Sequence, residues 1–504
     1  MGIIQSIKRW WDSLWQKEAQ DKFGVETIES DVMKAALDDW VNIYQGKPDW
    51  ITKDSDIEGY NFAKTLCNRT AWLSTLMLKI TVDGSDRAEV INKLMGGYVH
   101  QMKNDKCEKA CAFGYIVLKP NGKSIDYVMP WDFEPTHETD GKIDGGIFHD
   151  HHHEPGDKWY YTRLEYHRFE DWRVPQDNDV RLYRITNKTY KSTGTNGIGQ
   201  ECNIKETVWA DYEEEMAFTG VERPLFSIIK MPIANNIDLQ SPLGVSVFSN
   251  AIRELEGLDI AWTRLDDETY DSQHITFLGD SLIEEPGTPV RKRRSSGGIV
   301  DKIGRALPRR VRILPGSTTG EEYHEETPSL QTADRISEIN HRLDMVGVKC
   351  GYSPGWFVLD GRTGRITATQ VEADNQETID YIKHIRDAFK VATDGLIYAI
   401  GFYLDMDNPN DRRTVYLPEE EYKELEAAGE DMKYYYTAHY ALQDITYNFD
   451  EDRMRHWQYV QAGKYPLYRY YMKFEGMSEE EAKAVAAEAK SENEPQESGL
   501  FGEE

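Results

Sequence analysis

The sequence lacks any run of about 18 consecutive apolar residues, which is the length that a membrane-crossing helix requires. We therefore expect no membrane span. The sequence also shows no secretory signal pattern. Cysteine is scarce. The five cysteines, an odd number, are widely scattered, which favours a reduced compartment over a disulfide framework.

Basic residues are few relative to acidic ones. The chain has 59 Lys and Arg against 88 Asp and Glu, which gives a formal net charge of −29. Such a charge favours solubility and repels nucleic acid in general, so it argues against a protein that holds DNA by whole-surface attraction. The 504 residues can bury several cores, and we expect roughly two to four modules.

Recognisable catalytic motifs are also missing. The sequence contains no P-loop pattern, no GxSxG elbow and no HExxH pair. We therefore expect a protein that is not an enzyme, with no catalytic residues and no cofactor.

One histidine-rich run has the side chains of a metal site. Imidazole and carboxylate ligands suit zinc, nickel or manganese. A single compact run beside Pro155-Gly156 is more typical of an exposed loop, so we expect no metal. A metal-dependent hydrolase or nuclease that uses this run is kept as an alternative. The run comprises His149, Asp150, His151, His152, His153, Glu154 and Asp157.

The most informative pattern lies in residues 243–400, where a long helix, a basic insert, a second helix, a glycine-rich loop and a third long helix follow one another. Apolar residues in 243–271 recur every three or four positions, from Phe248 to Leu265. At about 1.5 Å per residue this helix would span roughly 43 Å. A rod of that length suits a wall or a shaft, and its apolar stripe must be covered by a neighbour, for which another copy of the chain is one candidate.

The second helix is expected at about 329–348, followed by glycines between 351 and 364. Thr367 with Gln370 resembles a capping box that opens the third helix.

The rest of the chain predicts an α+β fold in which helix predominates. Asn121-Gly122 between two apolar runs is a strong hairpin signal. The other expected elements are an amphipathic N-terminal helix (1–19), mainly helical structure over 28–112 with its clearest stretches at 57–78 and 87–112, strands near 159–166, 180–187 and 207–212, a helical module at about 450–490 whose last helix is capped by Ser478 and Glu481, and a disordered acidic end at 491–504.

Residues 291–312 concentrate positive charge in an otherwise acidic chain. Nine basic residues meet one acid, Asp301. The segment could contact nucleic-acid phosphate or an acidic protein surface, or it could be a solvated loop whose charges pair with acids of a neighbouring copy. The basic residues are Arg291, Lys292, Arg293, Arg294, Lys302, Arg305, Arg309, Arg310 and Arg312.

Several short motifs, in this order and spacing, resemble tailed-bacteriophage portal proteins, most of all those of long-tailed phages of Gram-positive hosts. The resemblance covers roughly residues 25–490. The motifs are Ala112–Lys119, Pro130–Thr136, Lys230–Asn236, Ser241–Phe248, Gly351–Gly355, Thr367–Val371 and Glu372–Asn375.

This resemblance implies a ring, usually dodecameric, at one vertex of the capsid, with DNA passing through its central channel. It implies a wing (1–235 and much of 367–440), two stem helices (236–271 and 329–350), a clip between them (272–328), a tunnel loop (351–366) and a crown (441–490). Lys349, Arg362 and Arg365 become candidates to face DNA. The clip arginines and Lys292 become candidates for contact with DNA or a partner.

The expected function is thus a non-enzymatic DNA conduit for genome packaging and ejection, located in the virion and, during assembly, in the host cytoplasm. Its implied partners are double-stranded DNA, the terminase large subunit, the head–tail adaptor, and the major capsid and scaffolding proteins. A conduit must let its cargo slide, and a mostly acidic chain with localised cations suits that demand. A scaffold that binds acidic partners through 291–312 is a second alternative.

Overall fold

The computed structural model divides the chain into two compact units, Met1–Leu442 and Gln443–Glu504. The residues that it describes are 19–52, 55–172, 180–194, 197–271, 275–279, 310–314, 323–326, 329–359, 376–406, 412–441, 449–462, 464–475, 477–478 and 481–487. The expected N-terminal amphipathic helix and the acidic end lie almost wholly outside these residues.

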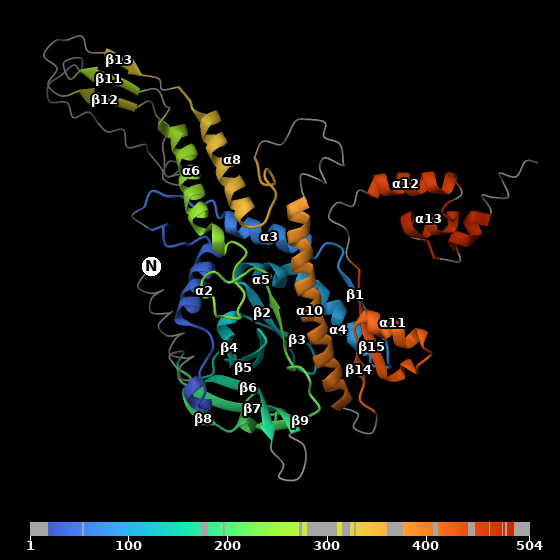
Figure 1. Ribbon diagram of the computed structural model, residues 1–504. Helices are drawn as coiled ribbons and strands as arrows, with labels where there is room; N and C mark the ends of the chain where they lie inside the picture. The colour runs from blue at the N-terminus through green and yellow to red at the C-terminus, as the bar shows by residue number, and fades with distance from the viewer. Residues whose placement is uncertain are drawn as a thin grey trace, which may run out of the picture. The chain divides into compact units, whose positions relative to one another are not determined.

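Helices and strands alternate in blocks along the chain (Figure 1). The α-helices are α2 (Asp31–Tyr44), α3 (Phe62–Ser74), α4 (Ala88–Gln101), α5 (Cys107–Phe113), α6 (Ile252–Asp271), α8 (Thr332–Lys349), α10 (Gln376–Met406), α11 (Glu419–Ala427), α12 (Phe449–Gln461) and α13 (Leu467–Phe474). The strands are β1 (Lys79–Gly84), β2 (Tyr115–Pro120), β3 (Ile125–Val128), β4 (Phe133–Thr139), β5 (Lys142–His152), β6 (Tyr160–Trp172), β7 (Val180–Ser192), β8 (Gln200–Cys202), β9 (Glu215–Thr219), β10 (Ser227–Lys230), β11 (Ile275–Gly279), β12 (Arg310–Leu314), β13 (Tyr323–Glu326), β14 (Val415–Tyr416) and β15 (Tyr435–Ala441).

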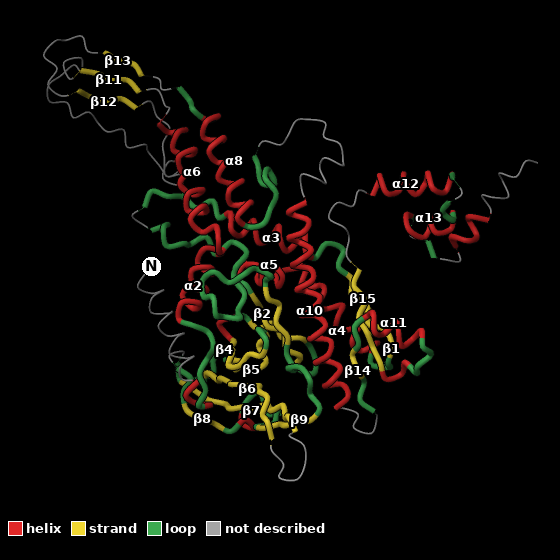
Figure 2. Tube along the Cα trace, in the orientation of Figure 1, coloured by secondary structure: helices red, strands yellow, loops and turns green. Residues whose placement is uncertain are grey.

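The strands form four separate sheets, and the predicted α+β class is confirmed (Figure 2). The largest sheet has the order β4-β5-β6-β7-β8, with β9 also paired to β7. The smaller sheets have the orders β10-β2-β3, β1-β15-β14 and β12-β11-β13.

The core of the first unit lies where α10 packs against the β10-β2-β3 sheet and against α3. Residues 115–118 of β2 are almost completely buried, and α10 contributes Ile382, Ile385 and Leu396 to the same interior. Continuous burial along residues 115–118 explains why this part of β2 is apolar throughout rather than alternating.

The predicted hairpin between β2 and β3 is confirmed. The Asn121 side chain accepts hydrogen bonds from the backbone N–H groups of Lys123 and Ser124 at 3.0 and 2.7 Å. Gly122 has a φ of +83°, a value that suits glycine at a tight turn.

The expected helical region 28–112 is confirmed only in part, because β1 interrupts it. Residues 57–61 are not helical, and a turn of π-helix at Met102–Lys106 separates α4 from α5. β1 pairs antiparallel with β15, from Lys79 opposite Ala441 to Gly84 opposite Tyr436. The partner strand lies far downstream, so local periodicity could not reveal this pairing.

The strand predicted at 207–212 is wrong. This segment forms successive turns, in which Ala210 N–H donates to Thr207 and Tyr212 N–H donates to Trp209. Its aromatic rings at Trp209 and Tyr212 lie against the Arg163 guanidinium, and this packing replaces strand pairing. The next strand, β9, begins only at Glu215.

The first long helix is shorter than predicted. It starts at Ile252 after a turn of 3₁₀-helix at Ser249–Ala251, whereas residues 243–248 are irregular. These irregular residues are buried beside the turn that enters β2, where Val247 N–H donates to Cys111. The second helix agrees with the prediction. The start of the third, at 367, lies outside the described residues, which resume at Gln376.

The second unit contains α12 and α13, and the predicted cap after them is confirmed. The Ser478 hydroxyl accepts a hydrogen bond from Glu481 N–H at 3.4 Å, while Ser478 N–H donates to the Glu481 carboxylate at 3.1 Å. No helix within the described parts of the chain is long and apolar enough to cross a membrane.

Candidate functional site

The two helices that flank the 272–328 insert lie side by side in antiparallel orientation (Figure 1). Glu268, near the end of α6, pairs with Arg335, near the start of α8, at 3.2 Å. At the other end of the pair, Glu254 of α6 accepts from Lys349 of α8 at 2.7 Å. The ion pairs therefore fix both the direction and the register of the two helices.

An apolar seam joins α6 to α8. The helices bury Leu255, Leu258 and Ala261 on one side and Ile339, Leu343 and Val346 on the other. Gly257 lies against the Arg342 guanidinium, and a side chain at this position would collide with it. Three-or-four spacing on both helices produces this seam, as the sequence pattern indicates.

A second surface of α6 is covered by Trp50, Glu58 and Tyr60 of the same chain. Asp259 accepts hydrogen bonds from Trp50 Nε1 at 2.9 Å and from Tyr60 N–H at 2.8 Å, and the Tyr60 ring packs on Trp262. Burial raises the pKa of Asp259, although both hydrogen bonds favour the carboxylate. The sequence predicted that a neighbour covers the apolar stripe of this helix. On this surface of α6, the covering residues belong to the same chain.

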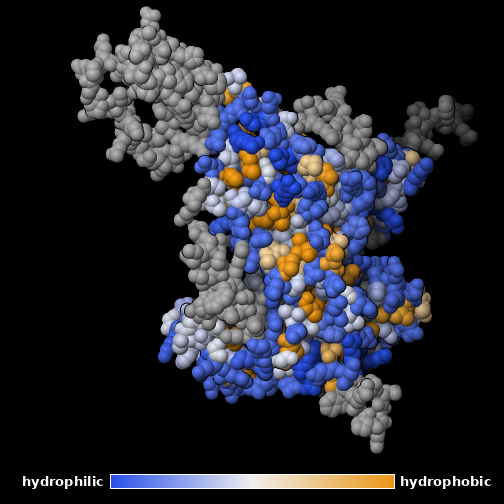
Figure 3. Space-filling view, turned by 60° about the vertical axis from the view of Figure 1, so that its left-hand side comes forward, coloured by the Kyte–Doolittle hydropathy of each residue, from blue (hydrophilic) through white to orange (hydrophobic). Residues whose placement is uncertain are grey.

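The face of α8 opposite the seam exposes apolar side chains. Met345 and Val348 are 41% and 45% exposed, and together with Ser337 and His341 they follow helical spacing along one stripe. Figure 3 shows one face of the molecule, on which hydrophobic patches, in orange, interrupt a mostly hydrophilic, blue surface. We call the residues 337, 341, 345 and 348 the outer stripe of α8.

Lys349, a candidate to face DNA, is ion-paired with Glu254 and remains 34% exposed. In the fold, the Lys349 ammonium group forms an ion pair that links α8 to α6. Arg362 and Arg365 lie outside the described residues.

Within the basic segment, Arg310 and Arg312 belong to β12, which runs parallel to β11. In the strand register Arg310 stands opposite Ile275, and Arg312 stands opposite Phe277. The remaining candidates of this segment lie outside the described residues: Arg291, Lys292, Arg293, Arg294, Lys302, Arg305 and Arg309.

The first part of the histidine-rich run, His149–His152, belongs to β5 and is not a loop, whereas residues 153–157 form the exposed turn that the sequence suggests. His149 is buried and pairs with Glu134 at 2.6 Å, whereas the exposed His153 ring stacks on Tyr160. Successive strand residues point to opposite faces, so His149 and His151 share one face of β5, with ring centroids 6.3 Å apart, whereas His152 lies on the other face. Within the described ranges, no three His, Cys, Asp or Glu side chains form a metal-binding group.

A buried charge network between β2, β5 and β6 was not anticipated. Lys119 donates to Glu165 at 2.6 Å, Arg163 pairs with both Glu165 and Asp150, and His167 Nε2 lies 2.7 Å from Glu165. Burial alone would raise the pKa of Glu165, but Lys119 and Arg163 outweigh burial and hold that pKa well below its usual range. The alternation of Arg163, Glu165 and His167 along one strand face was the available signal.

Comparison with known proteins finds no family model and no curated protein that matches this chain.

Proposed function

We propose that this chain is the subunit of a phage portal, a ring at the capsid vertex through which the genome is packaged and ejected. In this proposal α6 and α8 form the stem, and the β12-β11-β13 sheet forms part of the clip. The ring would dock the terminase large subunit and the head–tail adaptor and would contact the major capsid and scaffolding proteins.

The observation that carries the proposal is the antiparallel α6–α8 pair, together with a separate sheet formed by the segment that lies between the two helices in the sequence. All three strands of that sheet come from the segment between the two helices. A pair of helices whose connection forms a small sheet of its own supports the stem and clip that the sequence resemblance implies. The ion pairs at both ends of the rod support a stiff element.

The outer stripe of α8 supports assembly into a ring. In the single chain, α6 is covered by α8 and by Trp50 and Tyr60, whereas α8 leaves Met345 and Val348 41% and 45% exposed. Packing this stripe against the next subunit would remove only that exposed part from water, worth roughly 0.6–1.4 kcal/mol for each side chain, since full burial of a fully exposed side chain is worth about 1.5–3 kcal/mol. Repetition of one heterologous contact closes a ring when the rotation permits.

Mass photometry and negative-stain microscopy of the purified chain test the proposal. A dodecamer of the 58.2 kDa chain would have a mass of about 700 kDa and show rotational symmetry around an open centre. The double variant Met345→Asp/Val348→Asp should lose this species while keeping the circular dichroism of the folded subunit. Val208→Asp, at a similarly exposed valine in a turn, should still assemble.

A persistent 58.2 kDa monomer of the unaltered chain would refute the ring. A ring that survives the double variant would refute the α8 contact while leaving the ring itself in place. The other two candidate functions make different predictions. A hydrolase or nuclease would lose activity and bound metal on replacement of His151, His152 and His153, and a monomeric scaffold would show no rotational symmetry.

A further inference from the structure

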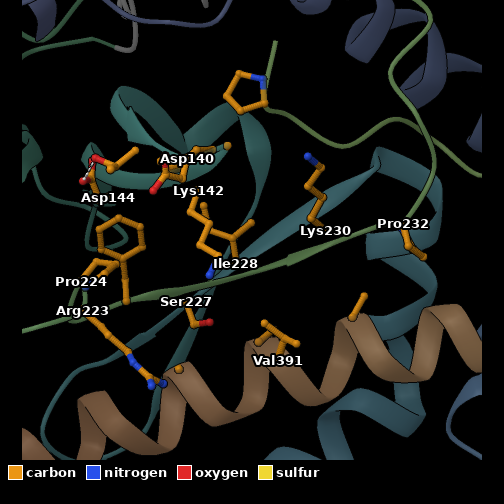
Figure 4. Close-up of a pocket in the computed structure, with 18 of the residues that line it drawn as sticks. Asp140, Lys142, Asp144, Arg223, Pro224, Ser227, Ile228, Lys230, Pro232 and Val391 are labelled. Atoms are coloured by element: carbon orange, nitrogen blue, oxygen red, sulfur yellow. Dashed lines mark hydrogen bonds between the residues drawn. The ribbon is translucent and has the colours of Figure 1, made fainter. Parts of the chain in front are cut away.

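A groove of about 930 Å³ lies between the β4–β5 turn at 139–144, strand β10 and the middle of α10 (Figure 4). Its size is within the range of protein sites that hold a small ligand or a short peptide. It is separate from the α6–α8 pair, and the proposed function does not use it.

One wall of the groove is the free edge of a sheet. β10 is the terminal strand in the order β10-β2-β3 and pairs only with β2 among the described strands. Met231 N–H donates to Gly114, so by strand alternation Ser227 and Ile229 also direct their backbone groups toward β2.

The intervening residues, Ile228 and Lys230, therefore direct their N–H and C=O groups away from β2 and toward the open edge. Apart from the ladder to β2, no backbone hydrogen bond joins these groups to another described residue. An exposed row of this kind is a template for an added strand.

The two sides of this edge differ in chemistry. Ile228 and Lys230 face the side of the β4–β5 turn, where Lys142 also lines the groove, whereas Val391 of α10 lies on the opposite side (Figure 4). Val391 is 66% exposed, although it belongs to a helix whose other face is buried in the core. The side of the β4–β5 turn thus carries two lysines, whereas the α10 side carries the aliphatic Val391 together with Arg223, whose guanidinium lies over the Tyr398 ring of α10.

Neither lysine forms an ion pair with a described residue. Burial lowers the pKa of Lys230, and the nearby Glu138 carboxylate partly opposes this shift. The Asp144 carboxylate nearby is already used, because it accepts from Thr139 at 2.7 Å and pairs with His137 at 2.5 Å.

The other two acids of the lining, Asp140 and Glu222, are exposed at its rim. In a chain of net charge −29, two unpaired lysines beside a free strand edge favour an acidic ligand.

We propose that this groove binds an extended acidic segment of a partner protein, which adds a strand to the free edge of β10. The backbone of the segment would exchange hydrogen bonds with Ile228 and Lys230. Its carboxylates would lie on the side of Lys142 and Lys230, and the alternate aliphatic residues would face Val391. This inference does not depend on assembly into a ring.

Fluorescence anisotropy with labelled probe peptides and the full chain tests the proposal. An octapeptide of alternating glutamate and valine should bind, and the corresponding peptide of lysine and valine should not. Lys142→Glu/Lys230→Glu should weaken binding by at least about tenfold, since it reverses two charges at the ligand. Lys123→Glu, the same change at the exposed β2–β3 turn, should leave binding unchanged.

Strand addition has its own test. Ile228→Pro removes an outward N–H that takes no part in the β2 ladder, a substitution that edge strands tolerate, and it should abolish binding. In the unaltered chain, bound peptide should slow hydrogen exchange at Ile228 and Lys230, which reports on the edge even if the proline variant is unstable.

Failure of the acidic peptide to bind at about 1 mM would overturn the proposal. So would equal binding of the two peptides or an unchanged affinity in the charge-reversed variant. Binding without protection of these two amides would exclude the added strand.

Discussion

Glu29 provides a sharp test of how burial controls stability in the first unit. This side chain is only 5% exposed and follows a segment that is fixed to β4, where Ile28 N–H donates to Pro135 at 2.9 Å. Burial raises the pKa of Glu29 from 4.5 to about 7, and the nearby Glu134 and Asp38 reinforce this shift, whereas Lys34 opposes it.

The direction of the pH dependence follows from the raised pKa. The folded state holds the Glu29 proton more tightly than the unfolded state does, so the contribution of this group is greatest below pH 4.5. Stability is then lost as the pH rises from 4.5 to about 7. A shift of this size corresponds to about 3 kcal/mol, at about 1.4 kcal/mol for each pKa unit.

In the variant Glu29→Gln the side chain cannot ionise, so the folded state should not lose stability through this residue as the pH rises. We expect the free energy of unfolding of the variant, relative to the unaltered chain, to increase by about 3 kcal/mol between acidic and mildly alkaline pH. Urea unfolding and hydrogen exchange of peptides from residues 27–44 would measure it. Comparing the two proteins at each pH cancels the other titrating groups that they share.

Glu26→Gln is the matched control, because Glu26 is exposed and lies in the same segment. This variant should follow the unaltered chain at every pH. A difference between Glu29→Gln and the unaltered chain that stays constant across this pH range would refute the reasoning, since it would mean that Glu29 does not change its protonation in the folded state.

Two further predictions concern the interior. Gly114 and Gly122 share a φ of +83°, but a Cβ at Gly114 would lie 2.5 Å from a backbone oxygen, whereas one at Gly122 would meet nothing within 4 Å. In thermal and urea unfolding, Gly122→Ala should cost about 1–2 kcal/mol and Gly114→Ala about 1–3 kcal/mol more, and equal costs would contradict this account. Glu165→Gln should destabilise the chain by about 3 kcal/mol, because it leaves buried cations poorly paired, whereas Glu170→Gln, at a partly exposed ion pair, should cost less than about 1 kcal/mol. Similar urea midpoints for these two variants would count against the buried network.

The sequence predicted those elements whose signals are local. The turn at Asn121-Gly122, the helix α8 and the Ser478–Glu481 cap depend on neighbouring residues, and all three are confirmed. The apolar seam of α6 and α8 is also local in origin, because three-or-four spacing determines which face of each helix is buried.

Contacts between distant segments were decided only by the tertiary structure. The pairing of β1 with β15 and the covering of α6 by Trp50 and Tyr60 each require a partner far away in the sequence. The burial of His149 depends on its contact with Glu134 of the neighbouring strand β4, which the composition of the run did not indicate. The free edge of β10 is also a property of the folded sheet. Periodicity shows which side of an element will be buried, but the residues that bury it become known only when the chain has folded.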